Sequence, residues 1–490
     1  MSWFLGGIAF LLLGYFTYGR LIERIIGTDD RKTPCVANPD GVDFVPLPQW
    51  KNMLIQLLNI AGVGPVLGVI LGIKFGKVAL LIIPVGCVLM GAVHDFFSGV
   101  MSIRQNGANM PRMVQNGLGA GFARAFAWFL MILLLLVVAV FVNVPASLID
   151  RQWFPDFPFF WWAAVAIFVY YIVATLFPVD QIIGRIYPIF GALLIIGSLA
   201  ISIALVLAAV QNPSLLADCA GFATDTFDQP IFPCLFVTIA CGIISGFHAT
   251  QSPIVARTIK SEREARATFY GMMIAEGIIA MIWAAAALAI YNAEPSTLEM
   301  AGPVVLGKIA THFLGSGLGG VTIAAIIVLA VTSGDTALRS SRLTLAEVCH
   351  IKQTKISLRV GTCLPLIVIV AALLWWSNLS PKSFGHLWNY FAWGNQVIAG
   401  TMLMTATVWL IRQGRGLKSA VTLLPGVFMC TVVISFILWA SPAKGQVWGA
   451  GLPYGVSLAL GVLFSIAFAA YAVWRGRKSS VGALGPKAMS

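Results

Sequence analysis

Otherwise apolar stretches of this sequence contain five titratable side chains: His94, Asp95, His248, Glu276 and Asp335. A charged or titratable group inside a bilayer is costly, so such residues are functional candidates. Counted from the ends of their predicted membrane spans, all five reach a similar layer between the middle of the membrane and its inner side. This shared depth predicts that they contribute to one polar site.

Several of these residues also have a purely structural interpretation. Asp335 stands four residues before Arg339, and an ion pair at that helical spacing would satisfy both side chains. His94 could instead bond a neighbouring backbone group, and Glu276 could pair with the basic loop that contains Arg257. Both interpretations remain open at this point.

The segment Phe232–Gly277 predicts an interrupted membrane helix that would position part of this site. The residues that interrupt or follow its apolar run are Gly242, Ser245, Gly246, His248, Gln251 and Ser252. Irregular backbone at membrane depth is tolerated only where it is buried in protein or lines a cavity, and broken helices form the substrate sites of many secondary transporters. The alternative is a glycine-rich helix packed closely against its neighbours.

A second interrupted helix is predicted in the motif IAGVGPVLG, which begins at Ile60. Gly62, Gly64, Pro65 and Gly68 crowd this short stretch, and proline removes a helical donor and clashes with the preceding turn. Carbonyl groups freed by this break, together with the hydroxyl groups of residues 332 and 333, would offer hard oxygen ligands to a small cation. Those hydroxyl groups could equally bond carbonyls of their own helix.

The 490-residue chain is 59% hydrophobic and only 10% charged. Soluble proteins carry about 25% charged residues, so this composition indicates an integral membrane protein. Apolar runs of about 18 residues or more recur and strand-like alternation is lacking, which favours helical spans. The net charge of +12 comes from Lys and Arg in short loops, so we expect contact with lipid and no nucleic-acid partner. No GxxxxGK[ST] motif occurs, which argues against ATP-driven transport by this chain.

The apolar runs predict about thirteen transmembrane helices. They cover residues 2–25, 52–76, 78–104, 122–145, 160–178, 185–210, 232–256, 268–291, 320–346, 357–377, 386–411, 420–440 and 453–474. With the N-terminus outside and the C-terminus inside, the outer segments keep only six of the 31 basic residues: Lys74, Lys77, Arg151, Lys308, Lys382 and Lys444. This asymmetry agrees with the positive-inside rule.

The two interrupted helices each lead a set of five spans, and the sets begin on opposite sides of the membrane. This arrangement predicts an all-α, polytopic protein with a five-plus-five inverted-repeat core and discontinuous first and sixth core helices. The predicted segments are an extra helix and cytoplasmic connector (1–51), the first repeat (52–210), an extracytoplasmic loop (211–231), the second repeat (232–411), and two peripheral helices with a tail (412–490).

Seven motifs in this order resemble the carbon starvation protein A family of bacterial inner-membrane transporters. They are GYFTYGR, TPCVANPDGVDFVP, IAGVGPVLG, GAVHDF, SGFHATQSP, TSGDTALRSSR and FAWGNQ. The resemblance implies an inner-membrane protein that takes up peptides or, in some members, pyruvate with protons. It also implies the core of the amino acid–polyamine–organocation superfamily, with substrate between the first and sixth core helices and often a cation between the first and eighth.

We therefore expect a secondary active transporter, not an enzyme, with a small-molecule substrate, a coupling cation or proton, and no cofactor. The expected substrate-binding residues are Gly62, Gly64, Pro65, His94, Asp95, Gly246, His248, Gln251, Ser252 and Asn395. The expected coupling residues are Ala61, Thr332, Ser333 and Asp335. Two alternatives remain: a redox protein with His94 and His248 as axial haem ligands, and a nutrient sensor that does not move its ligand.

Overall fold

The structure is a computed structural model that describes residues 1–40, 44–176, 179–217, 221–223, 229–349, 351 and 356–480. Parts of the predicted connector, of the predicted loop 211–231 and of the C-terminal tail therefore lie outside the described residues. The regular structure of the described part of the chain is almost entirely helical, and its isolated bridges include those that pair Lys32 with Ser261 and Leu47 with Ile259.

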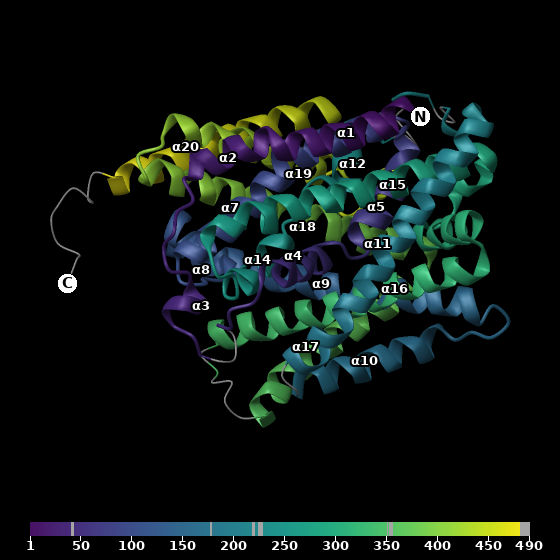
Figure 1. Ribbon diagram of the computed structural model, residues 1–490, viewed down its shortest axis with the longest axis horizontal. Coiled ribbons are helices and arrows are strands. Elements are labelled where there is room, and N and C mark those ends of the chain that lie inside the picture. Colours follow the sequence, from purple (N-terminus) through teal and green to yellow (C-terminus); the bar gives the residue numbers. More distant parts are fainter. Residues whose placement is uncertain are drawn as a thin grey trace.

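The helices follow one another with short connections (Figure 1). The first half of the chain contains α1 (Ser2–Phe16), α2 (Tyr18–Ile26), α3 (Pro34–Ala37), α4 (Gln49–Ile60), α5 (Gly64–Gly72), α6 (Ala79–Gly86), α7 (Ala92–Arg104), α8 (Met110–Leu118), α9 (Ala120–Trp153), α10 (Phe160–Leu176) and α11 (Val179–Gln211). The second half contains α12 (Ile231–Thr238), α13 (Ala240–Ile243), α14 (His248–Ala256), α15 (Gly271–Ala293), α16 (Gly302–Val348), α17 (Ile356–Ser377), α18 (Pro381–Arg412), α19 (Ala420–Trp439) and α20 (Tyr454–Ser480).

Ten described helical segments are long and apolar enough to cross a membrane, and the bent pair α4–α5 makes eleven. The predicted span 160–178 coincides with α10, and the predicted span 232–256 coincides with α12, α13 and α14 together. The described part of each of these helices is too short to cross a membrane by itself. The protein is thus a multi-span membrane protein. The count of thirteen spans remains a prediction.

Burial separates central helices from peripheral ones. The most apolar windows of α15 and α18 are 89% buried, whereas those of α17 and α20 are only 22% and 28% buried. Since lipid is as apolar as a leucine side chain, exposed apolar residues on the outer helices are suited to face the bilayer. The site must therefore be sought among α15, α18 and the short helices that pack against them.

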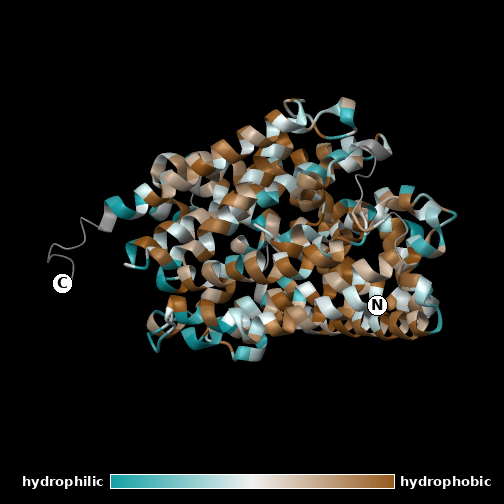
Figure 2. Cartoon of the chain, turned by 90° about the horizontal axis from the view of Figure 1, so that it is seen from above, coloured by the Kyte–Doolittle hydropathy of each residue, from teal (hydrophilic) through white to brown (hydrophobic). Residues whose placement is uncertain are grey.

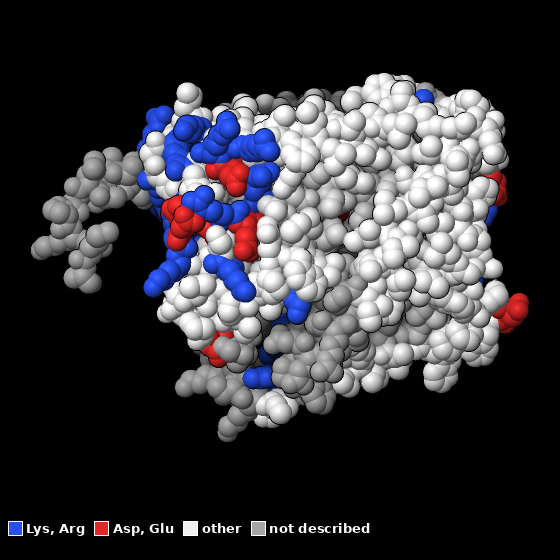
Figure 3. Space-filling model, in the orientation of Figure 1, with Lys and Arg blue, Asp and Glu red and all other residues white. Residues whose placement is uncertain are grey.

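The two ends of the long axis differ in charge. Lys and Arg side chains gather with a few acidic ones at the end that carries α2, α3 and α8, whereas the middle of the visible surface is uncharged (Figures 1 and 3). Hydrophobic residues likewise dominate the middle of the molecule in Figure 2. The N-terminus and the last described turn of α20 lie at opposite ends of this axis (Figure 1). We call the end with α2, α3 and α8 the basic end.

Candidate functional site

The first helix break lies at residues 61–63, between α4 and α5, and bends this span by 46°. Pro65 stands in the first turn of α5, where a missing N–H costs no helical hydrogen bond. A Cβ atom on Gly64 would lie only 2.6 Å from Cys241 Sγ, so glycine permits the first broken helix to touch α13. The predicted interruption at this motif is therefore present in the structure.

The second break follows α13, where the backbone becomes extended at Ile244 (φ −167°, ψ 133°) before α14 begins at His248. Asn395 on α18 stabilises this irregular segment. Its Oδ1 accepts a hydrogen bond from the Phe247 N–H at 2.7 Å, and its Nδ2 donates to Ser245 Oγ at 2.9 Å. A Cβ atom on Gly246 would collide with the Asn395 carbonyl oxygen. Asn395 was expected to contact substrate. In the structure its side-chain amide instead bonds the irregular segment at the second break.

Four buried titratable residues meet beside the second break. Both oxygens of Asp95 are engaged by imidazoles: Oδ1 lies 2.8 Å from His94 Nδ1, and Oδ2 lies 2.9 Å from His248 Nδ1. The other ring nitrogen of His248 lies 3.6 Å from Glu276 Oε2. All four side chains are at most 1% exposed. We call His94, Asp95, His248 and Glu276 the buried tetrad.

Three helices position the buried tetrad. α7 carries His94 and Asp95, α14 carries His248 in its first turn, and α15 carries Glu276. A π-helical turn at 87–91 leads into α7, and its last residue, Gly91, packs so closely against the Ile243 carbonyl that a Cβ would not fit. A pairing of Glu276 with the basic loop was considered from the sequence, whereas in the structure its carboxylate faces His248.

A small cavity of about 10 Å³ lies between the two breaks. Its lining includes Gly62, Gly64 and Pro65 from the first break, Ser245 and His248 from the second, and Ser333 from α16. A cavity of this size holds about one water molecule. The helices must therefore separate before an organic molecule can enter.

The remaining predicted residues of α14 bond within their own helix. Ser252 Oγ donates to the His248 carbonyl oxygen at 3.0 Å, and Gln251 Nε2 donates to Thr250 Oγ1 at 3.0 Å. Gln251 Oε1 is buried without a hydrogen-bond partner. The same holds for both side-chain polar atoms of Gln56 on α4, a residue that the sequence analysis did not single out.

The predicted coupling residues have different surroundings in the structure. Thr332 Oγ1 donates to carbonyl groups of its own helix, whereas Ser333 Oγ is buried, has no hydrogen-bond partner and lines the cavity. Asp335 lies 3.7 Å from Arg339 Nη2, the helical pair considered from the sequence. Ala61 forms the first residue of the first break.

The arrangement of the imidazoles differs from a haem site, in which two axial ligands would face each other across a wide gap. Here both Nδ1 atoms converge on the single carboxylate of Asp95. Among the described residues, no group of three or more His, Cys, Asp or Glu side chains is arranged to hold a metal ion.

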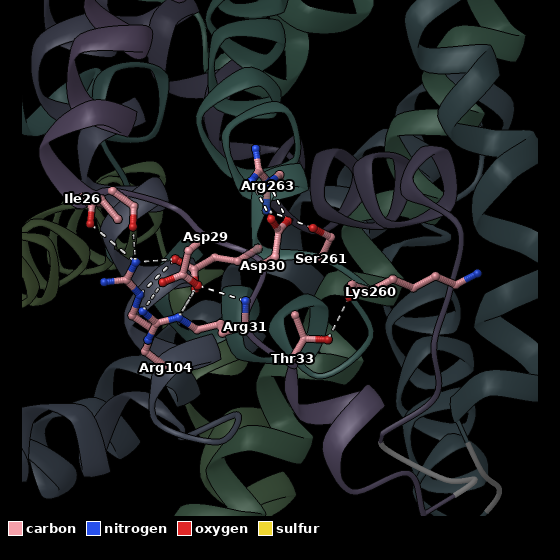
Figure 4. Close-up of polar contacts among 11 residues, drawn as sticks. Ile26, Asp29, Asp30, Arg31, Thr33, Arg104, Lys260, Ser261 and Arg263 are labelled. Carbon is pink, nitrogen blue, oxygen red and sulfur yellow. Dashed lines mark hydrogen bonds and ion pairs between the residues drawn. The ribbon is translucent and has the colours of Figure 1, made fainter.

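A network at the basic end ties α14 to the connector that precedes α4 (Figure 4). Glu262 is fully buried and accepts from Arg104 Nη2 at 2.5 Å, while Arg31 Nε lies 2.9 Å from its other oxygen. Arg263 pairs with Asp30 at 2.5 Å, and Thr33 Oγ1 donates to the Lys260 carbonyl at 3.2 Å. These contacts hold together the chain that leads into the first broken helix and the loop that follows the second.

The manganese transporter of Eremococcus coleocola, solved in complex with an aromatic bis-isothiourea substituted compound, has a similar fold. The TM-score is 0.57 over 90% of this chain and 99% of that chain, at 12% sequence identity. At this identity the likeness concerns the fold alone.

Three relatives are similar in sequence. An uncharacterized membrane protein of Haemophilus influenzae is 41% identical over 348 residues, which cover 61% of this chain and 93% of that protein. A peptide transporter CstA of Campylobacter jejuni is 24% identical over 87% of this chain and 78% of its own length. The pyruvate/proton symporter BtsT of Escherichia coli is 28% identical over 56% of this chain, and the match spans 47% of BtsT.

The sequence profile described as Carbon starvation protein CstA matches residues 1–155, 158–316 and 306–436. These ranges include both helix breaks and all four residues of the buried tetrad. The protein therefore belongs to the CstA family of membrane transporters, as the seven sequence motifs predicted.

Proposed function

We propose that this protein is a secondary active transporter that imports short peptides or small carboxylates such as pyruvate by alternating access. The observation that carries this proposal is the meeting of two broken helices at a buried cavity, since such breaks at membrane depth are typical of secondary transporters. The named functions of the CstA and BtsT relatives support the two substrate classes.

The proposed architecture has thirteen spans, with inverted repeats at 52–210 and 232–411. The breaks support it, because each proposed repeat begins with a span that is interrupted near its middle. The proposed orientation, with the N-terminus outside and the C-terminus in the cytoplasm, agrees with the opposite positions of the N-terminus and the end of α20 and with the gathering of Lys and Arg at the basic end.

Substrate would enter from the end opposite the basic end. A hollow of about 230 Å³ there is lined by Leu71, Lys74, Gln229, Asn389 and Gln446, among others. At Gly68, α5 approaches α12 so closely that an added Cβ would lie 2.9 Å from the Thr238 carbonyl oxygen. Movement at this contact would connect the hollow with the cavity.

The substrate carboxylate would bind at the start of α5. The N-terminus of a helix carries partial positive charge and free N–H donors, and α5 has no side-chain cap. Gly62 and Gly64 expose backbone to the cavity. The start of α14 is a weaker anion site, because Asn395 already accepts from the Phe247 N–H. His248 would contact the substrate from the opposite wall.

The position of the coupling ion is the second part of this proposal. Ala61, Thr332, Ser333 and Asp335 remain the cluster predicted from the sequence, and the unpartnered Ser333 Oγ at the cavity supports a polar ligand there. The buried tetrad offers a second cluster on the other wall.

Uptake into proteoliposomes tests the proposed function. Radiolabelled pyruvate and dialanine are offered to vesicles with and without an inside-alkaline pH gradient, and empty vesicles serve as the control. We expect saturable uptake of one of the two compounds, increased by the gradient. Uptake no faster than in empty vesicles for both compounds, with correctly inserted protein, would contradict the proposal.

A further inference from the structure

We propose that the buried tetrad carries the proton that moves with the substrate. The inference rests on the proposed transport function and concerns its coupling ion. It differs from the prediction made from the sequence, which placed the coupling site around Asp335.

The hydrogen bonds fix most of the protons in the tetrad. An ionised carboxylate can only accept hydrogen bonds, and both oxygens of Asp95 lie within 2.9 Å of an imidazole Nδ1. With Asp95 ionised, both Nδ1 atoms carry a proton. What remains is His248 Nε2 and Glu276 Oε2, which face each other at 3.6 Å, an ion-pair distance, and one proton shared by this pair can reside on either group.

The net charge explains why one proton can be exchanged. With a single proton shared between His248 Nε2 and Glu276, the tetrad carries one negative charge, that of Asp95. One further proton, on this pair or on the unpartnered Nε2 of His94, makes the tetrad neutral. Loss of the shared proton would leave two negative charges, and uncompensated buried charge is strongly unfavourable. The tetrad is thus suited to alternate between two states that differ by one proton.

The neighbours of the tetrad supply no permanent positive charge. Asp95, His248 and Glu276 interact electrostatically with one another, and no Lys or Arg in the described part of the chain acts on them. The titratable groups that face them from packed elements are the thiols of Cys87 and Cys241. Cys87 Sγ donates to a backbone carbonyl at 3.2 Å, as a neutral thiol does.

Beyond Cys87 lies the phenol of Tyr270. Its hydroxyl group donates to the Val88 carbonyl oxygen at 3.0 Å, so it too is satisfied as a neutral group. Among the described side chains around the tetrad, no fixed cation offsets its negative charge, so a proton is suited to do so.

Asp335 differs in this respect. Arg339 and Arg342 both act on its carboxylate, and the nearer guanidinium lies at 3.7 Å. Arginine stays protonated under all physiological conditions, so the charge of Asp335 is offset without a proton. Among the described residues that line the cavity, its helix contributes Ser333 and not Asp335.

Contact with the cavity links the proton to the substrate. His248 belongs both to the tetrad and to the cavity wall, so a carboxylate at the start of α5 would lie across the cavity from it. A nearby negative charge favours the protonated form of a titratable group, and such coupling is reciprocal: the proton strengthens binding of the anion by the same factor. Gln56 on α4 and Gln251 on α14 also have buried polar atoms without a hydrogen-bond partner, and such atoms are suited to bind a buried water molecule.

The test measures proton movement and substrate movement separately. Proteoliposomes are loaded with a pH-sensitive dye, and pyruvate or dialanine is added outside without any imposed gradient. Wild-type protein should acidify the lumen as it takes up substrate. Glu276→Gln should lose this acidification and reduce gradient-driven accumulation by at least about tenfold, while exchange between equal internal and external pools continues. Glu294→Gln is the matched control, because Glu294 pairs with Lys308 on the surface.

Two results would overturn the inference while leaving the transport function intact: wild-type uptake without acidification, and acidification that persists in Glu276→Gln but is lost in Asp335→Asn. Absence of any substrate movement in the wild type would remove both proposals. If Glu276→Gln does not fold, Glu276→Asp retains the carboxyl group further from His248 and should shift the pH dependence of uptake relative to Glu294→Gln. An unshifted pH dependence in this variant would also overturn the inference.

Discussion

His248 Nδ1 lies 2.9 Å from Asp95 Oδ2 and joins the first turn of α14 to α7 across 153 positions of the sequence. This bond connects the second half of a broken helix to a neighbouring helix. Any movement of α14 that opens the cavity must either break the bond or carry α7 along. The protonation state of the tetrad and the position of α14 are therefore linked through one hydrogen bond.

Gly64 provides a direct test of the contact between the two broken helices. Gly64→Ala would place a Cβ 2.6 Å from Cys241 Sγ, and overpacking of this kind costs about 1–3 kcal/mol. We expect uptake to fall strongly while the protein still inserts. Gly121→Ala is the control, since a Cβ there meets nothing within 4 Å. Equal uptake by the two variants would show that the approach of α5 to α13 does not matter for transport.

The sequence predicted the breaks but not how they are stabilised. Gly and Pro clusters mark where a helix stops, and His94, Asp95, His248 and Glu276 share a depth that indicated a common site. Which polar group bonds which depends on helices far apart in the sequence. For that reason Asn395 was expected to bind substrate, although its amide bonds the Phe247 N–H and Ser245.

Depth alone also could not separate Asp335 from the tetrad. Asp335 and the tetrad lie at a similar depth, but the neighbours that each side chain meets depend on how its helix packs. The i,i+4 spacing to Arg339 was the available signal for the structural interpretation, and the structure agrees with it at 3.7 Å.

Asp335→Asn distinguishes the two interpretations. If Asp335 mainly pairs with Arg339, its replacement should destabilise the protein by about 1–3 kcal/mol, the range for leaving a buried polar group without its partner. Arg339 Nη2 keeps one partner, the Ala174 carbonyl at 3.1 Å. Accumulation per folded molecule should then remain driven by the pH gradient. A variant of normal thermal stability that exchanges but no longer accumulates substrate would instead support the coupling site predicted from the sequence.

The orientation of the chain can be tested with single cysteines. Asn212 and Ala443 are exposed residues of predicted outer segments, and Gln413 is an exposed residue of a predicted inner one. Cysteines at the first two positions should react with an impermeant thiol reagent added to intact cells, and a cysteine at Gln413 should react only after lysis. Cys349 is exposed and is replaced in the background protein together with Cys219. Labelling at Gln413 in intact cells would reject the proposed orientation.

The last prediction concerns pH and the network at the basic end (Figure 4). Hydrogen bonds from Arg31 lower the pKa of Asp29, and those from Arg263 lower the pKa of Asp30. A carboxyl group whose pKa is lower in the folded state than in the unfolded state stabilises the folded state at any pH above its unfolded-state pKa. This stabilisation is lost as the pH falls through the pKa of the group in the folded state. The ordinary pKa of Asp is about 3.9, so both contributions are complete throughout the range from about pH 5 to pH 8.

Protonation of these two carboxylates therefore cannot cause a change in uptake within that range. Asp30→Asn should alter the rate of uptake by weakening the contact between the connector and Arg263, but the midpoint of the pH–uptake curve should coincide with that of the wild type. The measurement is initial uptake at equal internal and external pH, varied in steps from about pH 5 to pH 8. A midpoint displaced in Asp30→Asn would mean that the network at the basic end, and not a buried group near the cavity, senses the proton.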